Sequence, residues 1–304
     1  MSDTTVSIVT GWGGTLGTGH VQRMACLADH LRREGVRACI ATGAAPDFLP
    51  ARARDHFALD IAHDSACIIR DCRDSSVEEM QHLKTKCPVI AIDDCGPGRE
   101  HADLAIDLLP NLRYSVYSKD TFIFGYNFTD SIRSLGSRRI EKKIDIALYC
   151  GMDASPAEVR RLVPMLPDHA TTAVLAGNNS HYLQDGLRFP LDMSVSETLA
   201  ASKVLFTHFG ITLYEGHAAG CRLVCINPTP YHAELAERAR TDLDIINLGV
   251  VGRINPELGR ASLAAAMRSF PSGSIDTADI VRVIDTGLEN FHDAIRPLIE
   301  GPTS

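Results

Sequence analysis

The sequence lacks the marks of a membrane or secreted protein. None of its apolar runs approaches the roughly 20 residues that a membrane-spanning helix needs. Its first five residues are polar and lead straight into an apolar strand, without the basic region and apolar core of a secretory signal. We therefore expect a cytoplasmic protein with no stable membrane insertion.

Concentrated positive charge is also missing. The net charge is -8, and the longest basic cluster, residues 138–143, is short and is interrupted by Ile140 and Glu141. Binding to a nucleic acid requires a dense cationic surface that replaces the counterions of the phosphates. The charge pattern therefore argues against a nucleic acid partner.

Signals for metal sites and covalent catalysis are absent as well. The chain has nine cysteines but no Cys-x-x-Cys pair, and several cysteines fall inside apolar runs, which predicts buried reduced thiols (Cys39, Cys67, Cys150 and Cys225). Three histidines of the second half have spacings that match no metal-ligand signature (His208, His217 and His232). No Gly-x-Ser-x-Gly elbow occurs. We expect no metal, no cofactor and no covalent nucleophile.

Strand and helix patterns alternate in the first half of the chain. Short, nearly continuous apolar runs predict strands that are covered on both faces, at residues 6–10, 36–42, 66–69 and 88–92. Helical spacing covers residues 20–33, and Ser76 with Glu79 forms a capping box for a helix that reaches about Lys84. A parallel sheet follows from this alternation.

The pattern restarts after a polar, basic stretch at residues 134–143. Strands are predicted at residues 144–150, 171–176, 204–207, 223–226 and 245–248, and helices from Pro156 and at residues 196–201, 212–219, 231–240 and 256–268. Residues 277–299 form a long amphipathic helix that could pack across the boundary. We predict an α/β protein of two Rossmann-like domains, residues 1–138 and 139–304, that face a cleft.

The loop after the first strand is the main functional candidate of the first half. Open α/β sheets bind ligands beyond the carboxyl ends of their strands. Glycines crowd residues 11–19, which allows close backbone approach to a ligand, and His20 follows in the first turn of a helix. A helix N-terminus favours a neutral imidazole that can accept a proton. His20 is therefore either a general base or a capping residue.

Two further strand ends carry polar residues. Asp93 and Asp94 follow the fourth strand, where such acids could orient a histidine or bind sugar hydroxyls, although a helix-capping or turn-forming role explains at least one of them equally well. In the second half, Gly210 and Thr212 stand at a helix start that suits phosphate, and Glu215 could bind the hydroxyls of a ribose. An ordinary capped helix with an exposed acid is the alternative.

With these pieces assembled, the chain resembles the PseG/SpsG family of nucleotide-sugar hydrolases, and more distantly MurG. The most specific segment is Gly17-x-Gly19-His20-x-x-Arg23, which is similar to the family's Gly-x-Gly-His-x-x-Arg signature. Asp93-Asp94, Gly125-Tyr126 and Gly151-x-Asp153 resemble further family segments in the same order.

The resemblance implies a GT-B glycosyltransferase-like fold and hydrolysis, at the anomeric carbon, of a UDP-linked amino or deoxy sugar from nonulosonic (pseudaminic) acid or surface polysaccharide biosynthesis. His20 would activate water, with Asp94 as a second catalytic residue. Substrate-binding positions would be Gly17, Gly19, Arg23, Asp93 and Tyr126. Nucleotide-binding positions would be Gly151, Gly210, Ile211, Thr212 and Glu215.

The chain departs from the family in three places. It has Asn227-Pro228-Thr229-Pro230-Tyr231-His232 where the family has an Asn-Gln pair, one glycine of the Gly151 turn is missing, and the first loop lacks the usual polar residues. A changed substrate is compatible with these departures. Two other functions therefore stay open: a GT-B glycosyltransferase that uses a nucleotide-sugar donor, and a non-catalytic protein that binds a sugar nucleotide.

Overall fold

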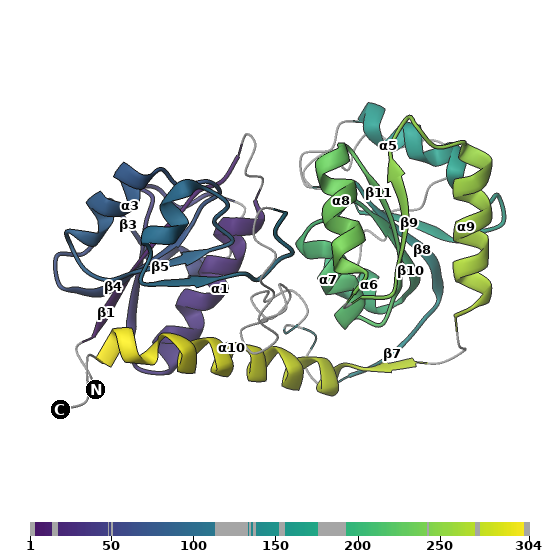
Figure 1. Ribbon diagram of the computed structural model, residues 1–304. Coiled ribbons are helices and arrows are strands. Elements are labelled where there is room, and N and C mark those ends of the chain that lie inside the picture. The colour runs from purple at the N-terminus through teal and green to yellow at the C-terminus, as the bar shows by residue number, and fades with distance from the viewer. Residues whose placement is uncertain are drawn as a thin grey trace. The chain divides into compact units, whose positions relative to one another are not determined.

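The structure is a computed structural model. It describes residues 4–13, 18–47, 49, 51–112, 133, 135, 138–151, 156–175, 193–241, 243–270 and 274–300. The chain divides into two compact units. The first contains residues 1–129 and 284–304, and the second contains residues 130–283. Helix α10 (Thr277–Glu300) therefore begins in the second unit and contributes most of its length to the first (Figure 1).

The first unit is built on a parallel sheet of six strands in the order β3-β2-β1-β4-β5-β6. Its strands are β1 (Thr5–Thr10), β2 (Arg37–Ala41), β3 (Phe57–Ala58), β4 (Ser65–Asp71), β5 (Val89–Ile92) and β6 (Leu104–Ile106). Its helices between them are α1 (Gly19–Arg33), α2 (Ala51–Arg54), α3 (Val77–Lys84) and the 3-10 helix η1 (Pro97–His101).

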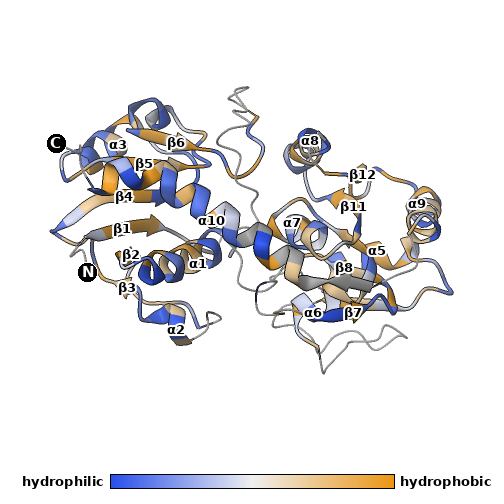
Figure 2. Cartoon of the chain, turned by 90° about the horizontal axis from the view of Figure 1, so that it is seen from below, coloured by the Kyte–Doolittle hydropathy of each residue, from blue (hydrophilic) through white to orange (hydrophobic). Residues whose placement is uncertain are grey.

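Strands β1 and β4 form the centre of this sheet, and the apolar residues in their middle are buried. Val6 and Ile8 of β1 and Ile68 and Ile69 of β4 are fully buried, and these strands are coloured mainly hydrophobic in Figure 2. The strand order turns back at this pair: the strands that precede β4 in sequence lie on one side of it and those that follow it on the other. Such a reversal is the point at which open α/β sheets bind ligands.

The second unit has a parallel sheet of five strands in the order β12-β11-β10-β8-β9. Its strands are β8 (Ile144–Tyr149), β9 (Thr172–Leu175), β10 (Ser202–Thr207), β11 (Arg222–Asn227) and β12 (Ile245–Val250). Its helices are α5 (Pro156–Leu162), η3 (Val163–Met165), α6 (Val195–Ala200), α7 (Ile211–Ala218), α8 (Pro230–Ala239) and α9 (Pro256–Arg268). Ile146, Phe206 and Val224 are fully buried in its core. The strand order turns back between β8 and β10.

The predicted fold class, α/β with two parallel sheets, is confirmed, and the predicted strands and helices lie within a few residues of the observed ones. The short strands β3 and β6 were not predicted, nor was the antiparallel pair of β7 (Arg139–Glu141) and β13 (Ser274–Asp276). They have two or three residues each, which is too short for a periodic pattern. Within the described ranges, no helix is both long and apolar enough to cross a membrane.

Candidate functional site

The reversal point of the first sheet brings the ends of β1 and β4 together below the start of α1. Thr10 and Asp71, the last residues of the two strands, are register partners. The Thr10 hydroxyl donates a 2.9 Å hydrogen bond to the backbone oxygen of Asp71. His20 is the second residue of α1, so its imidazole extends from the helix start toward the same strand ends.

His20 and Asp71 form a hydrogen-bonded pair. The distance between Nδ1 of His20 and Oδ1 of Asp71 is 2.8 Å, and the two side chains are 13% and 0% exposed. Burial raises the pKa of Asp71, but the charges of Arg23 and His20 and their hydrogen bonds outweigh burial and lower it to about 2. Because an ionised carboxylate only accepts, Nδ1 carries a proton, and in the neutral tautomer with this proton Nε2 is the acceptor.

Arg23, one helical turn after His20, fixes the Asp71 carboxylate from its other side. Its Nε lies 2.6 Å from Oδ2 of Asp71, and its Nη2 lies 2.5 Å from Oδ1. Its Nη2 also lies 3.3 Å from Nδ1 of His20, a contact without a bond because both groups are donors. This bidentate ion pair holds the Asp71 carboxylate in a single orientation.

Asp93 completes this buried charge network. Its Oδ2 lies 2.6 Å from Nη1 of Arg23 without hydrogen-bond alignment, so the attraction there is that of an ion pair. Burial lowers the pKa of Arg23, but the charges of Asp71 and Asp93 more than compensate and raise it. Burial raises the pKa of Asp93, and the charge of Arg23 opposes that rise. Arg23, at 1% exposure, therefore holds two carboxylates and lies beneath the surface.

The backbone at Asp93 is strained. Its φ of 49° is the only positive value among the non-glycine residues that the structure describes. Its Oδ1 accepts hydrogen bonds of 2.7 and 3.0 Å from the backbone N–H groups of Leu108 and Leu109. The strained residue thus ties the end of β5 to the turn after β6 while it pairs with Arg23.

Asp94 has a different environment from its neighbour. It is fully buried, and its Oδ1 accepts hydrogen bonds from the backbone N–H groups of Ser75 (3.0 Å) and Gly96 (2.8 Å). Its Oδ2 lies 3.1 Å from Nη1 of Arg70. Both carboxylate oxygens are therefore engaged by the protein itself, which braces the loops after β4 and β5.

In the second unit, the reversal point brings together the loops after β8 and β10. Gly151 follows β8 with a φ of 102°, which a side chain would oppose. Helix α7 begins after Gly210 without a side-chain cap, whereas side-chain oxygens cap α3, α6, α8 and α9. The first-turn N–H groups of α7, at Ile211 and Thr212, therefore stay available to an anion.

A buried asparagine fixes this helix start. Asn227, the last residue of β11, accepts a 2.9 Å hydrogen bond from the backbone N–H of Phe209 and donates to Asn247 and Gly249. The adjacent His208 stays neutral at neutral pH, since burial lowers its pKa to about 4, with Glu158 opposing and His232 adding to the shift. Sequence reasoning gave Asn227 no role, although a polar residue that ends an apolar strand was a usable signal.

The remaining predicted residues lie as follows. Gly19 is the first residue of α1, and Glu215 lies in the second turn of α7 with 8% exposure. Gly17 and Tyr126 lie outside the described residues. Asp71 was not predicted as a site residue. It lies two residues after the apolar run Cys67-Ile68-Ile69, at the end of a strand that pairs with β1, the strand that leads to His20.

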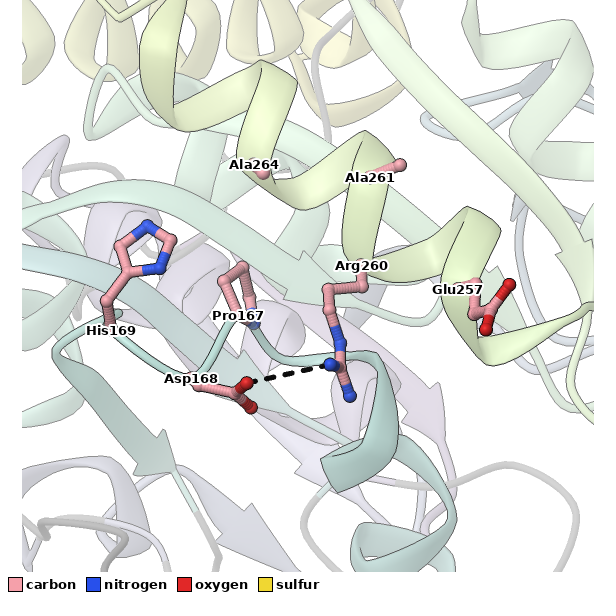
Figure 3. A pocket seen from close by; sticks show the side chains of 7 residues that line it. All are labelled: Pro167, Asp168, His169, Glu257, Arg260, Ala261 and Ala264. Atoms are coloured by element: carbon pink, nitrogen blue, oxygen red, sulfur yellow. Dashed lines mark ion pairs between the residues drawn. The ribbon is translucent and has the colours of Figure 1, made fainter.

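The surface pocket in Figure 3 belongs to a different part of the second unit. It has a volume of about 300 Å³ and lies between α9 and the loop that enters β9. Arg260 of α9 makes an ion pair of 3.7 Å with Asp168 and donates a 2.8 Å hydrogen bond to the backbone oxygen of Pro164. These contacts tie the helix to the loop, and no predicted site residue lines the pocket.

The part of the chain that the structure describes contains no cluster of three or more histidine, cysteine, aspartate or glutamate side chains suited to a metal ion.

Comparison with known proteins relates the chain to others by structure alone. No protein-family model matches the sequence, and no curated protein does. Many solved structures match the chain. The glycosyltransferase of kitacinnamycin is 12% identical with a TM-score of 0.59, over 98% of this chain and 100% of that one.

Two further matches have different activities in their descriptions. A protein of Listeria monocytogenes described as a putative UDP-N-acetylglucosamine 2-epimerase is 10% identical with a TM-score of 0.59, covering 99% and 98% of the two chains. The spinosyn rhamnosyltransferase in complex with thymidine diphosphate is 11% identical with a TM-score of 0.55, covering 98% and 100%. These likenesses establish a GT-B-like fold of two α/β domains.

Proposed function

We propose that the protein is a nucleotide-sugar hydrolase that cleaves a UDP-linked amino or deoxy sugar at the anomeric carbon. The observation that carries the proposal is the His20–Asp71 pair at the reversal point of the first sheet. A carboxylate that accepts from Nδ1 holds the imidazole in the tautomer whose Nε2 accepts a proton. This is the arrangement of a general base.

In the reaction, Nε2 of His20 takes a proton from a water molecule as the water oxygen bonds to the anomeric carbon. The bond between that carbon and the oxygen of the β-phosphate breaks, and the electron pair leaves with UDP. Asp71 stabilises the imidazolium that forms, as the carboxylate does in hydrolase triads. Gly19 begins the helix that carries His20, and Arg23 and Asp93 are positioning residues that act through Asp71.

The nucleotide is assigned to the second unit. The uncapped start of α7, with the N–H groups of Ile211 and Thr212, supplies donors and a positive dipole end for the pyrophosphate. Among the described residues, no atom lies within 4 Å of the position where a Cβ of Gly210 or Gly151 would stand, which favours close backbone approach of a ligand. Glu215 is proposed to accept from the ribose hydroxyls.

The experiment that tests the proposal measures nucleotide release from UDP-, CMP- and GDP-sugars without an acceptor. His20→Ala is expected to lower kcat for UDP-sugar hydrolysis by about 10² to 10⁴-fold and to leave UDP binding intact, since the base acts in the chemical step. Glu215→Ala is expected to weaken UDP binding. His82→Ala and Glu234→Ala, which remove exposed side chains of α3 and α8, are matched controls.

Two outcomes would contradict the proposal. Nucleotide release only after an acceptor is added would make the protein a glycosyltransferase. Binding of UDP-sugar without release under either condition would make it a non-catalytic sugar-nucleotide-binding protein.

We propose a structural role for Asp94 in place of the catalytic one expected from the family motif, because both of its carboxylate oxygens are engaged by the protein itself. Asp94→Ala leaves the backbone N–H groups of Ser75 and Gly96 and the guanidinium of Arg70 without their acceptor. We expect a loss of about 3 kcal/mol or more in the free energy of unfolding. The kcat per folded molecule, determined by active-site titration, should fall less than tenfold. A loss of kcat as large as that of His20→Ala, in a folded variant, would restore Asp94 to the chemistry.

A further inference from the structure

A buried lysine lies at the ends of two helices of the second unit. Lys142 directly follows β7, two residues before β8 begins, and is 7% exposed. Its Nζ donates hydrogen bonds to the backbone oxygens of Leu199 (3.3 Å) and Ala219 (2.5 Å). Leu199 lies in the last turn of α6, Ala219 caps the end of α7, and the two helices are neighbours (Figure 1). The amino group therefore lies where the free carbonyls of two helix ends favour a positively charged donor.

A cysteine sulfur lies against the same amino group. Cys221 directly precedes β11 and is 8% exposed, and its Sγ lies 3.8 Å from Nζ of Lys142, 79 residues away in the sequence. The sulfur also lies 3.2 Å from the backbone oxygen of Leu199 and 3.4 Å from that of Ser202. Backbone oxygens therefore hold a sulfur and a nitrogen nucleophile side by side, as the Lys142–Cys221 pair.

Burial disfavours the charged form of each member of the pair. It lowers the pKa of Lys142, and the neighbouring Cys221 opposes that shift. It raises the pKa of Cys221, and the charge and hydrogen bond of Lys142 oppose that shift. A neutral amine has a lone pair, so Nζ can accept the thiol proton and can also act as a nucleophile. The pair therefore contains a base for its own thiol.

The sulfur lies close to the surface of the second unit. Gly220, the residue before Cys221, is exposed, and Arg222 after it is half-buried. Hydrogen peroxide is close to water in size, so it is better suited to reach Sγ than glutathione or a protein thiol. The oxidant that fits the pair is therefore a small hydroperoxide.

We propose that the Lys142–Cys221 pair is an oxidation site at which a hydroperoxide joins Sγ and Nζ in a reversible sulfenamide bond. Sulfenic acids condense with a nearby nitrogen to form such bonds. The flexible stem of the lysine closes the 3.8 Å between the two atoms. The inference does not depend on the proposed hydrolase.

Two steps form the bond. In the first, Nζ takes the thiol proton, the sulfur attacks one peroxide oxygen, the O–O bond breaks, and the leaving hydroxide takes the proton from Nζ as water. The sulfur is thereby oxidised to a sulfenic acid, and the peroxide is reduced. In the second, the lone pair of Nζ attacks Sγ, the S–O bond breaks, and the leaving hydroxide takes a proton from the nitrogen as a second water. One thiol, one amine and one peroxide give one S–N bond and two waters.

The bond protects the thiol from irreversible oxidation. A sulfenic acid that meets more peroxide is oxidised to a sulfinic acid, which ordinary thiols do not reduce. The S–N bond engages the sulfur before that step. Dithiothreitol cleaves it, since its two thiols are oxidised to a disulfide while the thiol of Cys221 and the amine of Lys142 are restored. The pair therefore holds the oxidation in a reversible form.

The test treats the full-length protein with hydrogen peroxide and maps its peptides by mass spectrometry. We expect a cross-linked pair of peptides that contain residues 142 and 221, lighter than their sum by two hydrogen atoms, which disappears after dithiothreitol. Cys221→Ser should abolish the cross-link. Lys143→Arg, at the exposed neighbour, and Cys87→Ser, at a half-buried cysteine of the first unit, are the matched controls and should keep it.

Lys142→Arg separates the chemistry from the packing. Arginine keeps a positive donor at the helix ends but stays protonated, so it forms no sulfenamide. In this variant, peroxide should oxidise Cys221 to sulfinic acid, and dithiothreitol should no longer recover the thiol that it recovers in the wild type. Equal recovery in the two proteins would overturn the proposal. It would also be overturned if wild-type Cys221 is oxidised without an S–N bond, or stays unmodified at a peroxide concentration that oxidises Cys87.

Discussion

Asp71→Asn is expected to lower kcat for UDP-sugar hydrolysis by about 10³ to 10⁴-fold, with KM changed less than threefold. An asparagine at this position offers an N–H group or a neutral oxygen to Nδ1 of His20, so the ionised acceptor that selects the Nδ1–H tautomer is lost. The loss of the same acceptor in a hydrolase triad costs about 10⁴-fold in kcat. Initial rates of nucleotide release over a range of substrate concentrations measure the effect.

The chain provides a matched control for this prediction. Asp29 of α1 makes a second aspartate–histidine pair, with 2.7 Å between its Oδ1 and Nε2 of His56. His56 is buried and precedes β3, the edge strand of the sheet, whereas β1 and β4 are at its centre. Asp29→Asn removes the same chemical contact without touching His20, and its kcat should stay within about threefold of the wild type.

Equal losses in the two variants would mean that a folding defect, rather than the tautomer of His20, limits activity.

The fold could be read from the sequence to a large extent because its strands are buried on both faces. Nearly continuous apolar runs such as residues 6–10 and Ile144–Tyr149 are strong signals, and glycine or a capping serine marks several helix ends. The predicted strand at residues 66–69 stopped short, whereas β4 continues to Asp71. The reason is that a buried charged residue does not resemble a strand interior.

The part of the site that the sequence did not predict depends on pairs of side chains that are far apart in the sequence. Arg70, 3% exposed, is tolerated in β4 because Glu79 and Asp94 pair with its guanidinium at 2.9 and 3.1 Å. Asp71 is tolerated because Arg23 pairs with it 48 residues away. Periodicity carries no information on such pairs. The sequence motif therefore identified His20 and Arg23, but the carboxylate that joins them appears only when β1 and β4 are placed side by side.

Arg23→Met is expected to reduce the free energy of unfolding of the first unit by about 3 to 5 kcal/mol at neutral pH. Methionine fills much of the space but leaves the carboxylates of Asp71 and Asp93, 0% and 12% exposed, without their cation. Removal of one partner of a buried ion pair has a cost of this size. Urea denaturation followed by Trp12 fluorescence reports on the first unit, which holds the only tryptophan.

The pH dependence of this effect follows from Asp71. Its pKa is lowered from 3.8 to about 2 in the folded protein, so the stability that it contributes is present above pH 3.8 and is lost as the pH falls toward 2. Arg23→Met removes the cation that lowers this pKa, so the variant lacks that stability at every pH. The difference in the free energy of unfolding between wild type and variant should therefore become smaller as the pH falls from 3.8 toward 2.

Two comparisons separate the charge network from a general loss of packing. Arg33→Met, at an exposed position of the same helix, should change the free energy of unfolding by no more than about 0.5 kcal/mol. In the double variant Arg23→Met/Asp71→Asn, a neutral amide replaces the carboxylate that had lost its cation. The decrease in the free energy of unfolding should therefore be smaller in the double variant than the sum of the decreases in the two single variants. Additive losses that do not change with pH would instead show that Arg23 contributes its volume alone, and His20 would then lack the fixed carboxylate on which its proposed role depends.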